Sequence, residues 1–489
     1  MLCYLSLATL YSCFLDEPRG HGGSETIRRV LLVLVYTNSL LKARLWRLIF
    51  RPAQSHSPPV RVAGYGIVVT MKFRWLPLLV FASSCLCQNS GAPSTGERLT
   101  DALKSATSPI TVSSTGELGD TGGKLMTDAI EHAQFVLLGE SHFSRETPKL
   151  AAAVCRAMHP DSYAVEAGPY AAAYVNGLLT SPDRKAQMEK RERAHPANMA
   201  FLDNEQENDL AASCSSFSRN KSFALWGLDQ EFLGAASVLL MQMDAQHNGP
   251  TAAAAIRLAA EKDRQAEASA RSSGDATRLF LVSATDDDVS ALEAALAVDG
   301  TPESRAIMRE FGESRRIYRL NMARSPDSNA VRASLLKQHF LDHYRALQQT
   351  TATPRILLKF GDNHMWKGFN DLHQLDLGDF VAELASVEQT TSLHIQVIAA
   401  RGTLAGFGGY ARPMKNEPFV LSDVPEYSWL RPVIDMLPAD QGTGPKGVVV
   451  DLRKLRFRKI EMSIEWEHLV YGYDLLVMLP EFTSANLYQ

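Results

Sequence analysis

The chain has 489 residues, of which 45% are hydrophobic and 21% are charged, and its formal net charge at pH 7 is −4. That composition is typical of a globular protein, and the length allows one large domain or two modest ones. The balance of charge gives no support for nucleic-acid binding, which normally needs a basic face.

Residues 1–70 lack the pattern of a folded domain, and their apolar run Val30–Leu41 is too short to span a bilayer. At Met71 a segment begins that has the three regions of a secretory signal peptide, namely basic residues, an apolar run and small residues before Cys85. We therefore expect translation to start at Met71, residues 1–70 to be a mis-annotated extension, and residues 71–87 to be a signal peptide. A genuine long extension is the alternative.

The residues around Cys85 resemble a bacterial lipobox, so we expect an exported protein that is either periplasmic or anchored to the membrane by a lipid on Cys85. Of the 6 cysteines, only Cys155 and Cys214 lie in the expected folded body. In an oxidising compartment these two either form a disulfide or remain as buried thiols, and the sequence leaves both open. The disulfide is the prediction to be tested.

Residues 88–120 read as a polar linker and lead-in segment, and strand–loop–helix units follow over residues 121–400. The central stretch is Phe135–Glu146, FVLLGESHFSRE, in which an apolar run predicts a buried strand of a parallel sheet. Glu140, His142 and Arg145 follow in the loop before a helix. Because open α/β sheets bind ligands at this edge, the loop is a candidate site.

Three later strands end in the same way, in a small residue followed by polar side chains. Each acid alone would more often cap a helix or lie in a solvated turn, but the repetition predicts that the strand ends share one site. The fold class is therefore α/β, with a central, mostly parallel sheet and flanking helices. The strands and the residues that follow them are Tyr163–Val165 with Glu166, Phe223–Trp226 with Asp229 and Glu231, and Ile356–Phe360 with Asp362, Asn363 and His364.

A large helical insertion is predicted at about residues 237–350, where long segments lack glycine and proline. We expect it to form a cap over the sheet edge. In its last helix Arg332 continues an apolar stripe of Leu336, Phe340 and Tyr344. Such an arginine more often extends to the surface; the alternative is that it reaches into the cleft and holds an anionic group.

Residues 401–489 read as a loop-rich C-terminal segment with late strands. Before it, Leu377–Ala385 predicts a short helix, and His394 alternates with apolar residues in a strand, as a core histidine does.

The sequence lacks the motifs G-x-S-x-G, H-E-x-x-H and G-x-x-x-x-G-K-[ST]. The remaining candidates are His142, His364, Glu140, Glu166 and Asp229. A carboxylate that accepts one ring N–H of a histidine leaves the other nitrogen free to take a proton from water. The same groups would also suit a divalent cation, with His142, Glu166 and His364 as its ligands, and the metal would then generate the hydroxide.

The motifs GESH, VEAG, GLD and GDNH, in this order over Gly122–Leu384, resemble the superfamily that joins erythromycin esterases, ChaN-like haem-binding lipoproteins and TraB/Tiki-type proteins. The G-E-x-H spacing is like that of ChaN-like and TraB-like members, whereas the helical insertion looks more like the esterase branch. The resemblance implies that Glu140 and His142 are the catalytic acid and base. It also implies that Glu166 orients them and that His364 is a second polar residue facing the substrate.

These observations predict a hydrolase that cleaves an ester, lactone or amide of a small molecule with histidine-activated water. The alternatives are a haem- or small-ligand-binding lipoprotein and a metal-dependent peptidase of the Tiki type. A haem would draw on Met365, Tyr170 and Tyr174, although isolated methionine and tyrosine residues usually serve packing. No cofactor is certain, and the oligomeric state is open. The residues expected to face the substrate are Arg145, Asp229, Asp362, Asn363 and Arg332, with Arg145 or backbone N–H groups holding the developing oxyanion.

Overall fold

The computed structural model describes residues 98–438 and 446–488. The predictions for residues 1–70, for the signal peptide at 71–87 and for Cys85 therefore lie outside the described residues. In the part of the chain that the structure describes, none of the helices combines the length and apolar character needed to cross a membrane.

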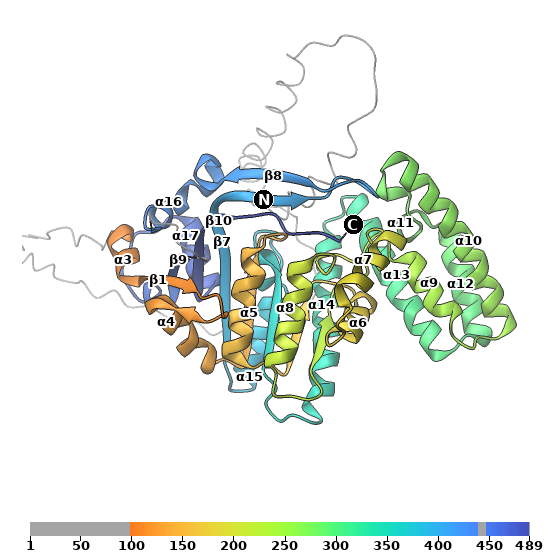
Figure 1. Ribbon diagram of the computed structural model, residues 1–489, viewed down its shortest axis with the longest axis horizontal. Coiled ribbons are helices and arrows are strands. Elements are labelled where there is room, and N and C mark those ends of the chain that lie inside the picture. Colours follow the sequence, from red (N-terminus) through yellow and green to blue (C-terminus); the bar gives the residue numbers. More distant parts are fainter. Residues whose placement is uncertain (1–97, 439–445, 489) are drawn as a thin grey trace, which may run out of the picture. The chain divides into compact units, whose positions relative to one another are not determined.

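A single ten-stranded sheet forms the centre of the fold, in the order β2-β1-β9-β10-β7-β3-β6-β4-β5, with β8 paired to β7 (Figure 1). The strands from β10 through to β5 pair in parallel, whereas β2, β1, β9 and β8 join by antiparallel pairs. The predicted α/β class with a mostly parallel central sheet is confirmed. The strands are β1 Thr107–Val112, β2 Leu118–Gly119, β3 Phe135–Glu140, β4 Ser162–Val165, β5 Ala224–Gly227, β6 Ile356–Gly361, β7 Ser392–Gly406, β8 Lys415–Val420, β9 Lys446–Asp451 and β10 Leu475–Phe482.

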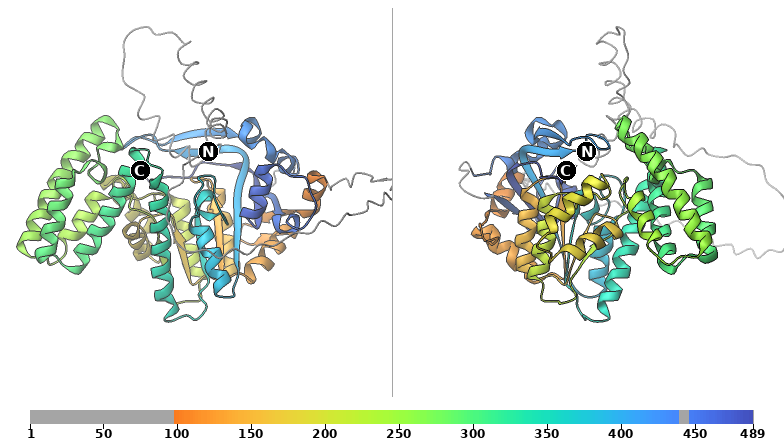
Figure 2. Two further views of the ribbon diagram at one scale, coloured as in Figure 1. Left: turned by 180° about the vertical axis from the view of Figure 1, so that it is seen from behind. Right: turned by 45° about the vertical axis from the view of Figure 1, so that its right-hand side comes forward.

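Helices cover both faces of the sheet, so the central strand β3 is buried along its whole length (Figure 2). Its side chains alternate between two apolar layers. Val136 and Leu138 pack against residues of α4, α5 and α8, while Phe135 and Leu137 pack against residues of α14, α15 and α17. This double coverage explains why the strand is a continuous apolar run rather than an alternating one.

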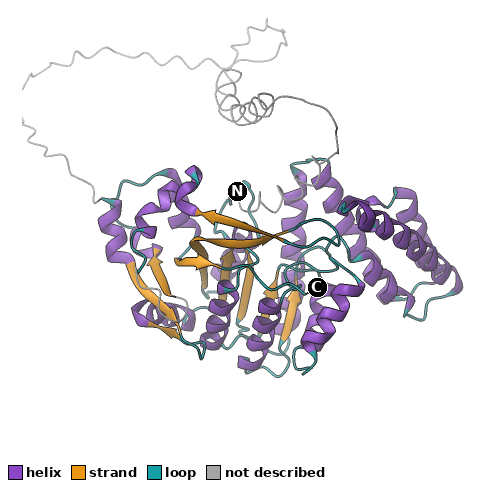
Figure 3. Ribbon diagram, turned by 45° about the horizontal axis from the view of Figure 1, so that its top comes forward, coloured by secondary structure: helices purple, strands orange, loops and turns teal. Residues whose placement is uncertain are grey.

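The predicted helical insertion is present between β5 and β6, where α9, α10, α12 and α13 pack on one another (Figure 3). Its helices begin at clear signals: Thr301 caps α13 before Pro302, and Thr285 and Asp288 form a capping box on α12. The last helix, α14, returns to contact β5 and α15. The helices are α3 Leu99–Ala106, α4 Asp120–Glu131, α5 Glu146–Met158, α6 Pro169–Leu178, α7 Arg184–Ala194, α8 Glu205–Phe217, α9 Ala236–Asp244, α10 Pro250–Ser273, α11 Phe280–Ser283, α12 Asp286–Asp299, α13 Pro302–Met322, α14 Asp327–Gln348, α15 Leu377–Val387, α16 Arg431–Ile434 and α17 Ile464–Gly472.

Two segments belong to the sheet although the sequence places them outside the domain. The lead-in segment contributes β1, which pairs with β9, and the C-terminal segment contributes β9 and β10, with β10 lying parallel to β7. Residue 400 falls inside β7 rather than at a boundary. These strands were missed as parts of the domain because their partners lie far away in the sequence, and pairing across such distances leaves no local pattern.

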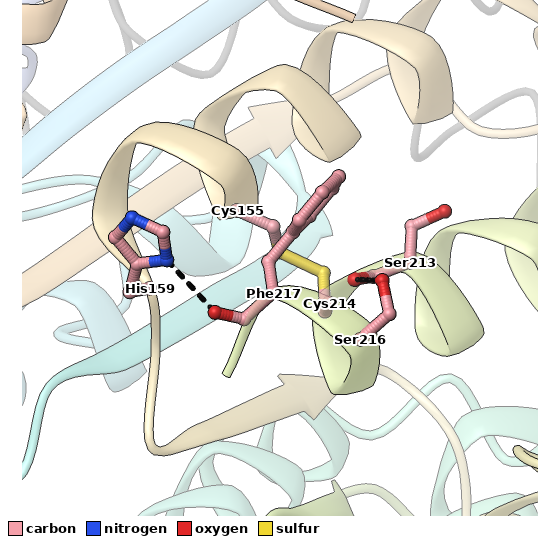
Figure 4. Close-up of a disulfide and its surroundings, with 6 residues drawn as sticks. All are labelled: Cys155, His159, Ser213, Cys214, Ser216 and Phe217. Atoms are coloured by element: carbon pink, nitrogen blue, oxygen red, sulfur yellow. Dashed lines mark hydrogen bonds between the residues drawn. A yellow bond between two sulfur atoms is a disulfide. The ribbon is translucent and has the colours of Figure 1, made fainter. Parts of the chain in front are cut away.

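The predicted disulfide between Cys155 and Cys214 is present and joins α5 to α8 (Figure 4). The two Cα atoms are 5.1 Å apart across a sequence separation of 59 residues, and both side chains are fully buried. Beside it, the carbonyl oxygen of Phe217 lies 2.8 Å from Nδ1 of His159. The link fastens two neighbouring helices on one face of the sheet.

Candidate active site at the carboxyl edge of the sheet

The register of the parallel strands brings the predicted strand-end residues to one edge. Glu140, the last residue of β3, lies opposite Gly361, the last residue of β6. On the other side of β6, Val165 of β4 lies opposite Lys359. Glu166, which follows β4, therefore emerges beside Gly361, and the loop that carries His142 emerges beside both.

His142 lies between two carboxylates. Its Nδ1 is 3.0 Å from Oε1 of Glu140, and its Nε2 is 3.2 Å from Oε2 of Glu166. The imidazole ring also stacks on Phe201, with 3.8 Å between ring centroids. A Cβ on residue 361 would lie 2.7 Å from Nε2, so a glycine is needed there for the ring to approach. Because 14% of the His142 side chain stays exposed, solvent reaches it.

A buried lysine that the sequence analysis did not single out stands behind Glu140. Lys359 of β6 donates to Oε1 of Glu140 and, over 2.6 Å, to Oε1 of Glu207 at the start of α8. Burial would lower the pKa of Lys359, but the two carboxylates outweigh it and raise the pKa above its usual value. Burial raises the pKa of Glu207 to about 7. The lysine thus fixes the carboxylate that holds His142.

Glu166 is surrounded by donors. Its Oε2 accepts from the backbone N–H of Gly361 at 2.6 Å, and its Oε1 accepts from Arg332 at 2.6 Å. Nε2 of His364 is 3.4 Å from the same Oε1. Burial would raise the pKa of Glu166, but the positive charges of His364, His142 and Arg332 hold it well below its usual value. Glu166 is therefore an anion that joins the positive groups of the site.

The expectation that Arg332 extends to the surface is wrong. The arginine instead reaches toward the strand ends and holds anionic groups there. Its Nε donates to Oδ1 of Asp229 at 2.9 Å, its Nη2 donates to the other oxygen of Asp229, and the same Nη2 donates to Glu166. The α14 helix packs on β5, so its arginine points at the carboxylates that follow β4 and β5. The predicted residues Asp229, Glu166 and Arg332 thus lie together.

His364 lies on the other side of Glu166, in the turn after β6. Its Nδ1 is 3.0 Å from Oδ2 of Asp376, the residue that caps α15. Its Nε2 is buried, and apart from the ion pair with Glu166 it has no hydrogen-bond partner among the described residues. Burial would lower the pKa of His364, but Asp376 and Glu166 raise it well above the usual value. The N–H on Nε2 of this imidazolium therefore makes no hydrogen bond to the described residues, although it lies close to Glu166.

His142 is also an imidazolium at neutral pH. Burial would lower its pKa, but Glu166 and then Glu140 outweigh burial and raise the pKa to about 9. The expectation that one ring nitrogen faces water freely is therefore wrong for this state, because both nitrogens face carboxylates. His142 becomes a base only after it loses a proton.

The structure does not bring Arg145 to the site. The guanidinium donates over 2.7 Å to the carbonyl of Ser484 and also to the side chain of Asn486, both in the segment after β10. Arg145 therefore anchors the segment after β10, and the prediction that it binds the oxyanion is wrong. Of the other predicted residues, Asp362 adjoins a cavity of about 240 Å³ with Ser141, and burial raises its pKa. Asn363 is buried beside His364, and its Oδ1 has no partner among the described residues.

The donors present do not fit a metal or a haem. In residues 98–438 and 446–488, no group of three or more His, Cys, Asp or Glu side chains is arranged to hold a metal ion. The oxygens of Glu166 already accept from Arg332 and from a backbone N–H. For haem, Met365, Tyr170 and Tyr174 belong to three separate apolar clusters, and the hydroxyl of Tyr170 donates to Glu303 at 3.4 Å.

Four residues that contact the side chains of the site were not predicted from the sequence, namely Lys359, Glu207, Asp376 and Phe201. A signal exists for Lys359 alone, because a charged residue inside the apolar run ILLKFG implies a buried partner. The other three come from segments without any motif. His394, in contrast, is a buried core histidine as predicted, with Nδ1 2.7 Å from the carbonyl of Met365.

The site therefore defines an α/β protein that carries an ion-paired histidine at the carboxyl edge of a mostly parallel sheet. No family model matches the sequence, and no curated protein matches it. Solved structures similar to this chain include a mutant of the erythromycin esterase EreC in its open conformation, with 15% identity over 75% of this chain and 95% of that chain and a TM-score of 0.47. A protein from Bacillus cereus has 11% identity over 80% and 98% of the two chains, with a TM-score of 0.47. A succinoglycan biosynthesis protein has 14% identity over 80% and 98%, with a TM-score of 0.48.

Proposed function

We propose that the protein hydrolyses an ester, lactone or amide bond of a small molecule, with His142 as the base that activates water. The observation that supports this most directly is the position of His142. The ring is fixed on one nitrogen by Glu140, remains partly open to solvent, and has Glu166 beside its second nitrogen. A histidine oriented by a carboxylate is the usual arrangement for removing a proton from water.

In the reactive state His142 is neutral, Nδ1 donates to Glu140, and Nε2 carries the lone pair. A water molecule that enters between Nε2 and Glu166 donates to both and is thereby aimed at the substrate carbonyl. The tetrahedral intermediate then needs a donor for its oxyanion. The N–H on Nε2 of His364 serves this role, because it is charged, buried and not engaged in a hydrogen bond. Arg145 is too fully engaged elsewhere to do so.

The test is a panel of p-nitrophenyl esters, lactones and anilides, assayed with the wild type and with His142→Ala. A general base contributes roughly a hundred- to ten-thousand-fold in rate, so the variant should lose most turnover while keeping its melting temperature within a few degrees. His132→Ala, at an exposed histidine that directly follows α4, is the matched control and should retain full activity. Wild-type turnover in His142→Ala would show that the assignment is wrong.

A second candidate function is binding of a small ligand without turnover. It is favoured by the complete ion pairing of the site at neutral pH, where Arg332, Lys359 and His142 all face carboxylates. Turnover of no compound in the panel across pH 6–10, together with binding of the probes described below, would favour this candidate over hydrolysis.

We also propose that translation starts at Met71 and that the protein is exported and cleaved next to Cys85, as a periplasmic or lipid-anchored form. The Cys155–Cys214 disulfide supports this, because such bonds persist in oxidising compartments. Mass spectrometry of the mature protein tests it, with an N-terminus expected next to Cys85. Abundant peptides from residues 1–70 would contradict the proposal.

A further inference from the structure

A cavity of about 450 Å³ lies beside the site, and the stacking partner of His142 forms part of its wall. Phe201 stacks on the His142 ring, and Phe143 follows His142 directly in the chain; both line the cavity. The volume lies within the range of small-molecule pockets. Its main apolar residues are Phe143, Phe201, Phe232, Leu233, Phe407 and Leu487.

The backbone around this cavity is strained. Nine described residues other than glycine have a positive φ, and four of them line the cavity: Phe143 at +65°, Ala197 at +55°, Phe201 at +59° and Ala411 at +52°. Bulky aromatic residues rarely adopt this conformation, and such outliers gather at ligand-binding and catalytic sites. The cavity therefore has the character of a formed site rather than of a packing gap.

Two acidic side chains also line this apolar cavity, Glu192 of α7 and Asp203 in the loop before α8. Only 7% of Glu192 is exposed, and its Oε1 accepts from Asn198 at 2.6 Å. The Oδ1 of Asp203 is buried without a hydrogen-bond partner among the described residues. Burial, and then the charge of Asp203, raise the pKa of Glu192 to about 8, and burial raises that of Asp203 to about 7. At neutral pH these two carboxyl groups are therefore largely protonated, and a cation bound beside them would favour the loss of those protons.

Arginines are also present: Arg193, Arg271 and Arg412 line the cavity, and the charge of Arg191 partly offsets the effect of burial on the pKa of Glu192. Arg271 pairs with Glu267 at 2.7 Å, and Arg412 donates to the carbonyl of Ser272. Arg193 has an exposed side chain. Arg191 lies close to Glu192, but its guanidinium donates to Asn198 at 2.6 Å and sits over the ring of Tyr174.

We propose that this cavity binds a protonated amine carried on an apolar ring or chain, with Glu192 and Asp203 holding the ammonium group and the phenylalanine rings enclosing the apolar part. An aromatic wall adds cation–π attraction for the same group. Because Phe201 touches both the cavity and His142, the ligand lies next to the base. The proposal thus extends the proposed function by naming the chemical class of its substrate.

The test uses two probes that cannot be hydrolysed, phenethylamine and the neutral phenethyl alcohol, measured by isothermal titration calorimetry on the full mature protein. The amine should bind about tenfold or more tightly than the alcohol, as expected for hydrogen bonds to charged groups. Glu192→Gln and Asp203→Asn should each remove most of that preference and leave the affinity for the alcohol unchanged. Glu192→Gln keeps an oxygen that can accept the hydrogen bond from Asn198, so this contact is retained.

Asp209→Asn is the matched control, because it removes one negative charge at an exposed position of α8 and should keep the preference. Ala200→Phe, which fills the cavity, should abolish binding of both probes. The proposal is overturned if the alcohol binds as tightly as the amine, if neither probe binds at millimolar concentration, or if the preference survives in both acid variants. Both probes are measured by binding alone and cannot be hydrolysed, so a failure of the hydrolytic function remains distinguishable from a failure of this site.

Discussion

Nε2 of His142 lies 3.2 Å from a carboxylate oxygen of Glu166, on the side of the ring opposite to Glu140. This contact makes the histidine a cation at neutral pH and gives the site a state in which it cannot accept a proton. Activity then depends on removing that proton or on inserting water into the contact.

The first prediction concerns pH. Since the pKa of His142 is about 9, the neutral base becomes more abundant as the pH rises, and kcat/KM should increase about tenfold per pH unit up to that value. Glu166→Gln removes the largest electrostatic contribution that raises this pKa, so its rising limb should move to lower pH, with a lower plateau because the ring is held less well. Rate profiles of both proteins from pH 6 to 10 decide the matter. A wild-type profile that is flat over this range would contradict the assignment.

The second prediction concerns Lys359. Lys359→Met leaves Glu140 and Glu207 buried without their cation, and loss of one partner of a buried pair typically costs about 3–5 kcal/mol in the free energy of unfolding. Urea denaturation measures this loss, and Lys124→Met, at an exposed lysine of α4, should cost almost nothing. Adding Glu207→Gln to Lys359→Met should restore part of the stability, because one of the two uncompensated charges is removed. A double variant no more stable than the single one would contradict this account.

The third prediction concerns Arg332. Arg332→Lys keeps the charge, but one ammonium group cannot reproduce the fork that holds both oxygens of Asp229 and one of Glu166. The free energy of unfolding should fall by about 2 kcal/mol, and kcat/KM should fall with it because Glu166 is no longer fixed. Arg345→Lys, at an exposed position of the same helix, is the control. Equal behaviour of the two lysine variants in chemical denaturation and in the assay would refute the role given to Arg332.

The fourth prediction concerns the disulfide. It closes a separation of 59 residues, so replacing Cys155 and Cys214 by serine should lower the free energy of unfolding by roughly 4 kcal/mol in the chain-entropy model. Kinetic constants should change little, since the bond lies on a helical face rather than at the strand ends. Thiol titration of denatured, unreduced protein checks the premise, and free labelling of both cysteines would rule the bond out.

The residues that sequence reasoning found lie at the ends of strands or within three residues after them, namely Glu140, His142, Glu166, Asp229 and His364. Parallel strands end at a common edge, so their spacing along the chain suffices to predict that they meet. The failures have a common cause as well. Phe201, Glu207 and Asp376 come from loops and helix starts whose position depends on tertiary packing, and β1, β9 and β10 depend on pairing with distant strands. Arg145 was misplaced because the sequence does not show that the segment after β10 returns to the same loop.

The chain order of the sheet has a consequence for biosynthesis. Glu140 and Lys359 are 219 residues apart, and both neighbours of β3 are made after the whole helical insertion. While the chain grows, the helices α5 and α8 are made early, but the apolar strand FVLLG has two open edges until β6 and β7 appear. The nascent chain therefore carries an unpaired, aggregation-prone strand for much of its synthesis. The candidate active site can be completed only after β6 and β7 have been made. Protection by a chaperone during that interval should raise the yield of active protein more than it changes the stability of the finished molecule.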